Sequence, residues 1–249
     1  MHPSHHSPHS FEFSTLGGWV ATKASGMKKN RYGNIEDIVK EVVLLTAGGS
    51  PKNGGGEERE EMWQHHEGGG KVAYGRVSCG VELKDLVIGS EGNLGIITSC
   101  ICRVRPVATR FEFDSVLLHD FSDGVSFMRE LKKVAGVNMP VSVRMVDNEQ
   151  FRLAQVMKGG EGGGVVSGLK KLLVLRGYGF KVKSMVGVTL KYEGNEEEVR
   201  AQKRAVEKCV KACHGVQGGG EGGKAGYDLT FAIAYLRDFA LTYGLVAER

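Results

Sequence analysis

A short glycine-punctuated segment, Gly89 to Gly95, constrains the fold of this chain more than any other stretch. It reads Gly-Ser-Glu-Gly-Asn-Leu-Gly and runs directly into the apolar residues 96–98. Glycines at this spacing let the backbone approach a bulky ligand and expose amide N–H groups, and Ser90 adds a hydroxyl donor. A tight turn between two strands is the simpler interpretation. The segment therefore predicts a turn that either reverses the chain or lines a ligand site.

A second segment, residues 11–37, is rich in small residues but follows neither a helical nor a strand period. Its hydroxyl groups, on Ser14, Thr15, Thr22 and Ser25, and its N–H groups suit a polar ligand with a phosphate and a ring edge. An ordinary Gly/Ser loop would have the same composition. Composition alone leaves both interpretations open.

Two apolar runs mark the strands expected in the first half of the chain. Residues 38–46 form one run. Residues 81–106 form another that is rich in β-branched side chains, with residues 96–98 leading into residues 101–105. Pro106 closes the second run, because proline cannot donate to a strand ladder. The rhythm of the sequence changes there, so we predict one domain over residues 1–106 and a second over residues 107–249.

The second half alternates strand and helix patterns, which predicts an α+β domain with helices on one face of an antiparallel sheet. Strands are expected at residues 113–119, 141–145 and 186–192, and helices at residues 122–136, after Asp147, at 196–214 and from Asp228. Ser122 is the expected N-cap of the first of these helices. Its inward residues would be Val125, Met128, Leu131 and Val134, and those of the last helix Ile233, Leu236 and Ala240.

Glycine is in excess, at 37 of 249 residues, about twice the usual share. Much of the excess lies in three patches, residues 53–70, 159–164 and 218–223. Runs rich in glycine and glutamate bury little surface, so we predict flexible surface insertions. None has the strand-then-helix setting of a phosphate loop.

The charge and hydropathy of the chain exclude several classes of function. The formal net charge is only +4, and basic and acidic residues are mixed along the sequence, which argues against nucleic-acid binding. No apolar stretch approaches the roughly 20 residues of a membrane helix, so any lipid contact would be peripheral. The histidine-rich residues 1–9 are expected to form a solvated tail.

Five cysteines, an odd number, argue against a disulfide framework and for a reducing compartment. Cys100 and Cys102 alternate within an apolar run and should share one face of a strand. Cys209 and Cys213 should share one face of a helix. A zinc site needs four ligands, so we expect buried thiols and no metal.

Three segments carry a resemblance to a known family. Residues 89–95 resemble the Gly-Ser-Glu-Gly-Thr-Leu-Gly segment of flavoproteins with a vanillyl-alcohol-oxidase (PCMH) type of FAD domain. Residues 11–37 are similar, almost residue for residue, to the FAD segment of alkylglycerone-phosphate synthases. Residues 142–151 resemble the same family's Ser-x-Arg-x-x-Asp-Asn-x-Gln-Phe segment.

The resemblance implies a fold and a set of site residues. Residues 1–106 would be the latter half of the FAD-binding domain, and residues 107–249 part of an antiparallel-sheet-plus-helices cap domain. Arg144 would lie near the flavin as a catalytic group, unless it is a solvated arginine on a strand face. Lys23 stands where the family usually has arginine. The cofactor-binding residues would be Pro8, Ser10, Phe11, Glu12, Phe13, Ser14, Thr22, Lys23, Ala24, Ser25, Gly89, Ser90, Glu91, Gly92, Asn93, Leu94 and Gly95.

The activity that the resemblance implies is a step of ether lipid biosynthesis. Such an enzyme exchanges the acyl group of acyl-dihydroxyacetone phosphate for a long-chain fatty alcohol through a flavin N5 adduct. It works in peroxisomes, and the resemblance leaves peripheral membrane contact and a homodimer open.

Two other interpretations remain. The family's pyrophosphate loop would precede Phe11, and its tyrosine acid/base and histidine-rich segment would follow Arg249. The chain is therefore expected to be an internal stretch, and a non-catalytic fragment is one alternative. A flavin-linked D-2-hydroxyacid dehydrogenase of the D-lactate type is the other.

Overall fold

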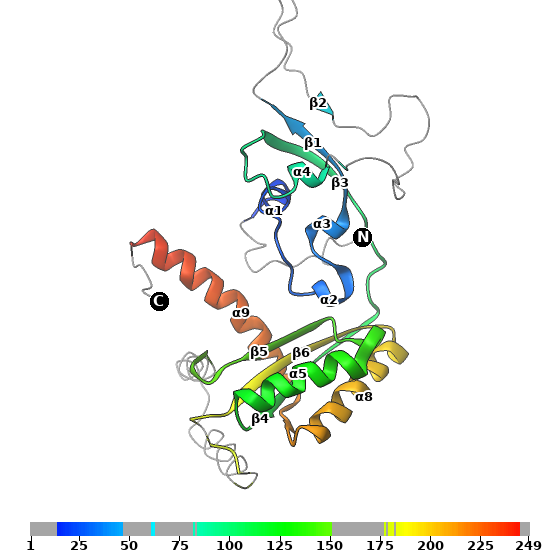
Figure 1. The fold of residues 1–249 in the computed structure, drawn as a ribbon, viewed down its shortest axis with the longest axis vertical. Helices are drawn as coiled ribbons and strands as arrows, with labels where there is room; N and C mark the ends of the chain where they lie inside the picture. Colours follow the sequence, from blue (N-terminus) through cyan, green and yellow to red (C-terminus); the bar gives the residue numbers. More distant parts are fainter. Residues whose placement is uncertain are drawn as a thin grey trace, which may run out of the picture. The chain divides into compact units, whose positions relative to one another are not determined.

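The computed structural model describes residues 14–46, 61–62, 82, 84–150, 177, 179–181 and 183–244. The chain forms two compact units, Met1–Val107 and Ala108–Arg249 (Figure 1). Their assignment to an FAD-binding domain and a cap domain stays a prediction.

The first unit is built on a small antiparallel sheet in the order β2-β1-β3. These strands are β1 (Val39–Leu45), β2 (Glu61–Met62) and β3 (Ile96–Cys102). β3 covers only residues 96–102 of the run predicted at residues 81–106. Val39, Val42 and Leu44 of β1 are buried in a core that also includes Val20, Ile35, Val87 and Ile88.

The first unit also has four short helices: α1 (Leu16–Ala21), α2 (Lys29–Tyr32), α3 (Ile35–Ile38) and α4 (Lys84–Val87). Three of them lie in the segment that shows no regular period in sequence. Capping explains α1, where the N–H of Gly18 donates to Thr15 Oγ1 at 3.0 Å. In α3, Asn34 and Asp37 form a capping box. These helices are too short for an apolar period to show.

The second unit has a four-stranded antiparallel sheet in the order β5-β6-β4-β7. The strands are β4 (Arg110–Leu118), β5 (Ser142–Val146), β6 (Val186–Gly194) and β7 (Val216–Gln217). The three predicted strands are thus present, and the α+β fold class is confirmed. The prediction missed only the two-residue β7, which is too short to show a period.

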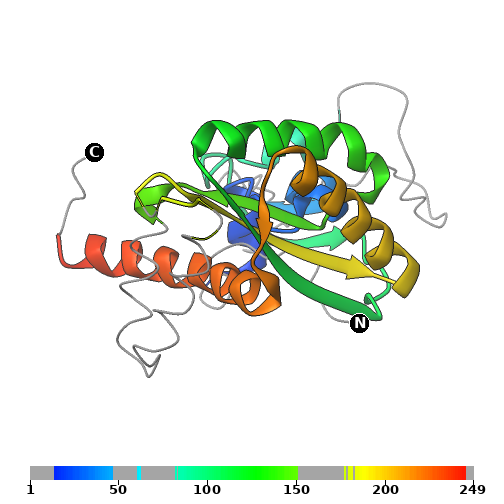
Figure 2. The ribbon, with the colours of Figure 1, turned by 90° about the horizontal axis from the view of Figure 1, so that it is seen from below.

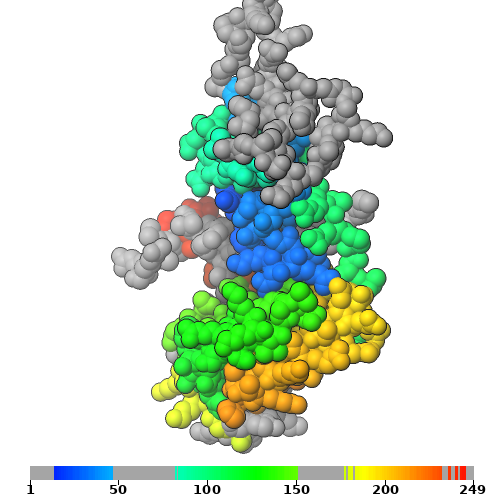
Figure 3. All heavy atoms as spheres, turned by 45° about the vertical axis from the view of Figure 1, so that its right-hand side comes forward, coloured from blue at the N-terminus to red at the C-terminus, as the bar shows by residue number. Residues whose placement is uncertain are grey.

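Helices lie on both faces of this sheet, so the prediction that they cover one face was wrong. α5 (Phe121–Ala135) and α8 (Glu196–Ala212) pack on the face that presents Val116, Val188 and Leu190. Figure 3 shows these two helices side by side. α9 (Gly219–Thr242) packs on the opposite face, which presents Phe113 and Thr189 (Figure 2).

The cap and inward face of α5 differ from the prediction. Asp120, not Ser122, is the N-cap, and its carboxylate accepts the N–H of Asp123 at 2.9 Å. Gly136 ends the helix with φ +50°, as expected. The buried residues are Gly124, Phe127, Leu131 and Ala135, whereas Val134 is 42% exposed.

Gly124 sets this face of α5. A Cβ there would approach Val186 Cγ2 to 3.1 Å and overlap the Met145 sulfur. Because glycine carries no apolar side chain, it gives no signal in a periodicity pattern. Leu131 is the one predicted inward residue that is buried. Gly124 and Phe127 lie one position before the predicted Val125 and Met128, whereas Ala135 lies one position after the predicted Val134.

α8 follows the prediction more closely. Asn195 and Glu198 form its capping box, with bonds of 2.8 Å in each direction, and Val199, Val206 and Val210 are buried. Its Gln202 side chain is also buried. It donates to the Glu193 carbonyl at 3.1 Å and accepts the Glu193 N–H at 3.4 Å.

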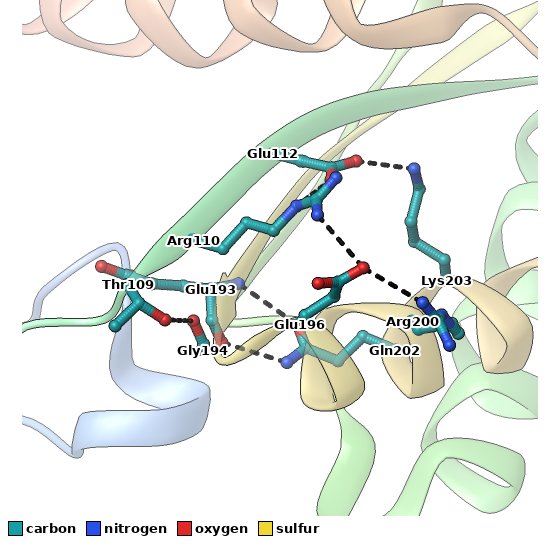
Figure 4. A network of polar contacts seen from close by, with 9 residues as sticks. All are labelled: Thr109, Arg110, Glu112, Glu193, Gly194, Glu196, Arg200, Gln202 and Lys203. Carbon is teal, nitrogen blue, oxygen red and sulfur yellow. Dashed lines mark hydrogen bonds and ion pairs between the residues drawn. The ribbon is translucent and has the colours of Figure 1, made fainter.

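An ion-pair network joins the same helix to β4 (Figure 4). Glu112 Oε2 lies 2.6 Å from Lys203 Nζ, and Glu112 Oε1 lies 2.7 Å from Arg110 Nε. The hydrogen bond from Lys203, together with one from Arg110, lowers the pKa of the Glu112 carboxyl. The network links the start of β4 to the first half of α8.

The glycine run at residues 218–223 is not a flexible insertion. All of it but Gly218 belongs to α9, which begins at Gly219 and not near Asp228. A Cβ on Gly220 would lie 3.1 Å from the Phe113 carbonyl oxygen, and one on Gly223 would overlap the Asp114 backbone. The glycines therefore let the helix approach the sheet backbone. The other two patches, residues 53–70 and 159–164, lie outside the described residues.

The later turns of α9 are less buried than predicted. Leu236 is 50% exposed, and Phe239 and Tyr243 are exposed with their rings 4.5 Å apart. The first turns of α9 contact the sheet closely, through Gly223, Gly226 and Tyr227. Ala240 is partly buried, and the Ile233 side chain lies outside the described part.

Within the described residues, no helix is long and apolar enough to cross a membrane.

Gly223→Ala tests the close approach of α9. Alanine normally stabilises a helix interior by about 1 kcal/mol relative to glycine. Here the new methyl group would strike the Asp114 backbone, so we expect a loss of about 1–3 kcal/mol in the free energy of unfolding. Urea denaturation followed by far-UV circular dichroism measures it. Lys224→Ala, on the exposed neighbour, is the control and should change stability by less than about 0.5 kcal/mol. Equal or greater stability of Gly223→Ala would contradict the packing.

Candidate functional site

The two small-residue segments of the first unit meet at the end of α1. The N–H of Gly89 donates to the Val20 carbonyl at 3.0 Å, and the N–H of Glu91 donates to the Ala21 carbonyl at 2.9 Å. These bonds join parts of the chain about seventy residues apart in sequence. The structure thus brings Thr22 and Lys23 beside the Gly89–Gly95 segment.

Left-handed backbone conformations occur on both sides of this junction. Lys23 has φ +52° and Glu91 φ +51°, and Gly89 and Gly92 also have positive φ. Positive φ is uncommon for residues other than glycine, and strained backbone of this kind gathers at ligand sites. The N–H groups of Lys23, Gly89 and Glu91 themselves donate to carbonyls at the end of α1.

Glycine is required for different reasons at different positions of the Gly89–Gly95 segment. A Cβ on Gly95 would overlap the carbonyl oxygen of Leu45, so Gly95 allows β3 to approach β1. A Cβ on Gly92 would meet nothing within 4 Å. Gly92 is favoured by its φ of +84°, which side chains rarely adopt, and Gly95 is needed for packing.

Ser90 differs from the other hydroxyl residues of these two segments, because its hydroxyl group lacks a hydrogen-bond partner among the described residues. Its Oγ is buried, while its N–H donates to the Val87 carbonyl at 3.1 Å. A buried hydroxyl without a partner destabilises a fold by about 1–3 kcal/mol. Such a group is well explained if a bound molecule completes its bonding. The donor set at this site therefore fits a polar cofactor.

The other predicted hydroxyls already bond within the first unit. Ser14 Oγ accepts the Trp19 indole N–H at 2.6 Å, Thr22 Oγ1 donates to the Gly18 carbonyl at 2.8 Å, and Ser25 Oγ donates to Asn34 Oδ1 at 2.9 Å. Each hydroxyl keeps lone pairs but has a structural task. Sequence reasoning could not reveal these bonds, because they depend on the fold of α1–α3.

The remaining predicted cofactor residues have less specific surroundings. Ala24 donates its N–H to the Trp19 carbonyl at 2.9 Å, and Asn93 donates its N–H to the Ser90 carbonyl at 2.9 Å. Leu94 is 49% exposed. Pro8, Ser10, Phe11, Glu12 and Phe13 lie outside the described residues.

Arg144 belongs to the second unit, on β5. Its Nη1 donates to the hydroxyl of Thr230 on α9, and its carbonyl accepts a 3.4 Å hydrogen bond from Thr189 Oγ1. The side chain is half-buried, and burial lowers the pKa of the guanidinium. Within the described part of the chain, no carboxylate offsets that desolvation.

This environment disagrees with a solvated arginine on a strand face. A desolvated guanidinium held by a hydroxyl retains donors for an anionic or carbonyl oxygen. Sequence reasoning missed Thr230, which is 2% exposed, because its only signal is its place one turn after Gly226 in α9. Thr230 Oγ1 lies 3.4 Å from the Gly226 carbonyl, which orients its hydroxyl.

Comparison with known proteins identifies relatives of this chain in both sequence and fold. The model of an FAD binding domain matches residues 4–54. Alkyldihydroxyacetonephosphate synthase of Caenorhabditis elegans is 37% identical over 98% of this chain, which spans 38% of that protein. A solved structure of an alkyldihydroxyacetonephosphate synthase superposes on 95% of this chain with a TM-score of 0.73 and 27% identity, and the chain covers 39% of it.

A more distant relative shares part of the chain. D-lactate dehydrogenase of Anaerostipes hadrus is 36% identical over 95 residues, which are 38% of this chain and 17% of that protein. The match to the synthases extends over nearly the whole chain, in both sequence and fold. The chain spans little more than a third of the relatives it matches, and it belongs to the alkyldihydroxyacetonephosphate synthase family of FAD-binding enzymes.

Proposed function

We propose that this chain forms part of an enzyme that exchanges the acyl group of acyl-dihydroxyacetone phosphate for a long-chain fatty alcohol. The partnerless, buried Ser90 hydroxyl in the Gly89–Gly95 segment carries the proposal. It lies in a turn that is hydrogen-bonded to the end of α1, within the unit that contains the FAD-domain match. Ether lipid synthesis is the metabolic context of this exchange.

The first unit would hold FAD through its two joined segments. Ser90 would donate or accept a hydrogen bond, Gly92 would leave room for the ligand, and Lys23 would place a positive charge beside it. When bound, FAD would supply the N5 nucleophile and electron sink that the exchange requires. Lys23 keeps the charge but lacks the planar fork of an arginine, so it would act as a point charge on a phosphate.

Arg144 would stabilise negative charge that develops during the exchange. Its guanidinium is already desolvated and oriented by Thr230, so little reorganisation is needed when charge appears. Thr230 would act as a positioning residue, because it touches Arg144 and not the reacting atoms. The β5 register supports this role, since Val143 and Met145 pack toward the α5 and α8 side and Arg144 points to α9.

An FAD-linked D-2-hydroxyacid dehydrogenase is the second candidate, because a D-lactate dehydrogenase matches part of the chain. The two activities differ in net redox change. A dehydrogenase would bleach the flavin absorbance on anaerobic addition of D-lactate, whereas a synthase would not. Peroxisomal location, peripheral membrane contact and a homodimer stay predictions from the family.

Ser90→Ala in the full-length enzyme tests the cofactor role. Removing a partnerless hydroxyl should leave the stability of the flavin-free protein unchanged or raise it by about 1 kcal/mol. FAD affinity should fall about threefold to tenfold, since one neutral hydrogen bond is lost. Flavin fluorescence titration of the apoprotein measures the Kd. Ser99→Ala, on an exposed position of β3, is the matched control. Equal FAD affinity of the two variants would refute the role of Ser90.

Arg144→Lys in the same enzyme tests the catalytic role. An ammonium cannot reproduce the guanidinium fork, so ether-bond formation should slow by about a hundred- to a thousandfold, or about 2.7–4 kcal/mol. Tm and bound flavin should change little. Arg129→Lys, on the exposed side of α5, should keep full activity. Near-normal turnover of Arg144→Lys would leave the arginine without a catalytic task.

Thr230 variants separate positioning from packing. Thr230→Val removes the hydroxyl but keeps the shape, so it should lower kcat while the KM for the acyl substrate stays within about twofold. Thr230→Ser restores the hydroxyl and should restore kcat. If both variants lower kcat equally, the methyl group matters instead of the hydrogen bond.

A further inference from the structure

Cys100 and Cys102 form a close pair of thiols on β3. They are two residues apart on one face of the strand, and their Sγ atoms lie 3.6 Å from each other. Both side chains are half-buried against the core of the first unit. We propose that this pair is a two-sulfur binding site for a thiophilic centre, of the class of trivalent organoarsenicals. The proposal is independent of the proposed enzymatic activity.

The sulfur separation supports chelation. Around a tetrahedral zinc ion, with bonds of about 2.3 Å, two thiolates lie roughly 3.8 Å apart. An arsenic(III) centre is pyramidal, and its smaller bond angle brings two bound sulfurs somewhat closer together. The two Sγ atoms are already close to this distance. A disulfide needs about 2.05 Å and a matching Cα separation, which an extended i, i+2 pair reaches only with backbone movement. The resting geometry therefore favours a shared centre over oxidation.

The proton distribution in the pair also favours binding. The hydrogen bond between the two thiols lowers the pKa of Cys102 to about 7 and raises the pKa of Cys100. Cys102 therefore forms the thiolate, the nucleophilic form, more readily than an ordinary cysteine. Cys100 remains the neighbouring thiol that completes the chelate.

The number of sulfur atoms in the site limits the kind of centre that it can bind. Within the described residues, no group of three or more His, Cys, Asp and Glu side chains could hold a metal ion. A four-coordinate zinc site is thus not formed there, whereas an arsenic(III) centre that carries an organic group needs only two thiols. In the reaction with R–As=O, two As–S bonds form and the oxygen leaves as water with both thiol hydrogens. No electron transfer is required.

The other described cysteine pair is a natural comparison. Cys209 is fully buried, and burial raises the pKa of both Cys209 and Cys213. Neither forms a thiolate readily, and an arsenical could not reach Cys209 without opening the helix packing. The two pairs should therefore differ in reactivity in the folded chain.

The experiment uses the whole chain with Cys79→Ser, because Cys79 lies outside the described residues. One equivalent of phenylarsine oxide is added to the native, reduced protein, followed by N-ethylmaleimide and peptide mass spectrometry. Cys100 and Cys102 should both be protected from alkylation, and 1,2-ethanedithiol should remove the protection. Cys209→Ser should keep it, while Cys100→Ser and Cys102→Ser should each lose it.

Three results would overturn the site: no protection in the native chain, protection that maps to Cys209 and Cys213, or protection that survives in Cys100→Ser. The first two need no substitution in β3, so they hold even if a serine variant folds poorly. Cys100→Ala and Cys102→Ala provide variants without a new polar group against the core, and they should also lose protection.

Discussion

Both units of this protein depend on places where two backbone segments approach each other closely. Such an approach is possible only where a residue has no side chain. In the second unit, Gly220 and Gly223 bring α9 against the backbone of Phe113 and Asp114. In the first, Gly95 brings β3 against the Leu45 carbonyl. The site residues depend on these approaches. Thr230 reaches Arg144 because the glycine turns before it lie on the sheet.

The sequence predicted strands and their order along the chain well, because their apolar alternation is long and regular. β4, β5 and β6 lie within a few residues of the predicted ranges. It failed where glycine determines the packing. The inward face of α5 depends on Gly124, and the start of α9 consists of glycines that composition assigns to a flexible loop. A missing side chain gives no apolar signal, although its packing contribution is large.

The candidate site was predictable in its segments but not in its bonds. The Gly89–Gly95 motif and residues 14–25 could be found from residue types, and the structure joins them through Gly89 and Glu91. The sequence could not reveal which hydroxyl lacks a hydrogen-bond partner, because Ser14 and Ser25 bond to residues that only the fold brings near them. Ser90 stands out only once those bonds are known.

The two hydrogen bonds between Gln202 and Glu193 have a consequence for solubility. β5 pairs with β6 only as far as Lys191, so the backbone of Glu193 faces a side of the sheet where no β5 residue opposes it. The Gln202 amide bonds both its N–H and its carbonyl, as a peptide group of another strand would. Exposed strand edges recruit foreign chains and lead to aggregation. A single side chain from α8 thus closes this stretch of edge to a foreign strand.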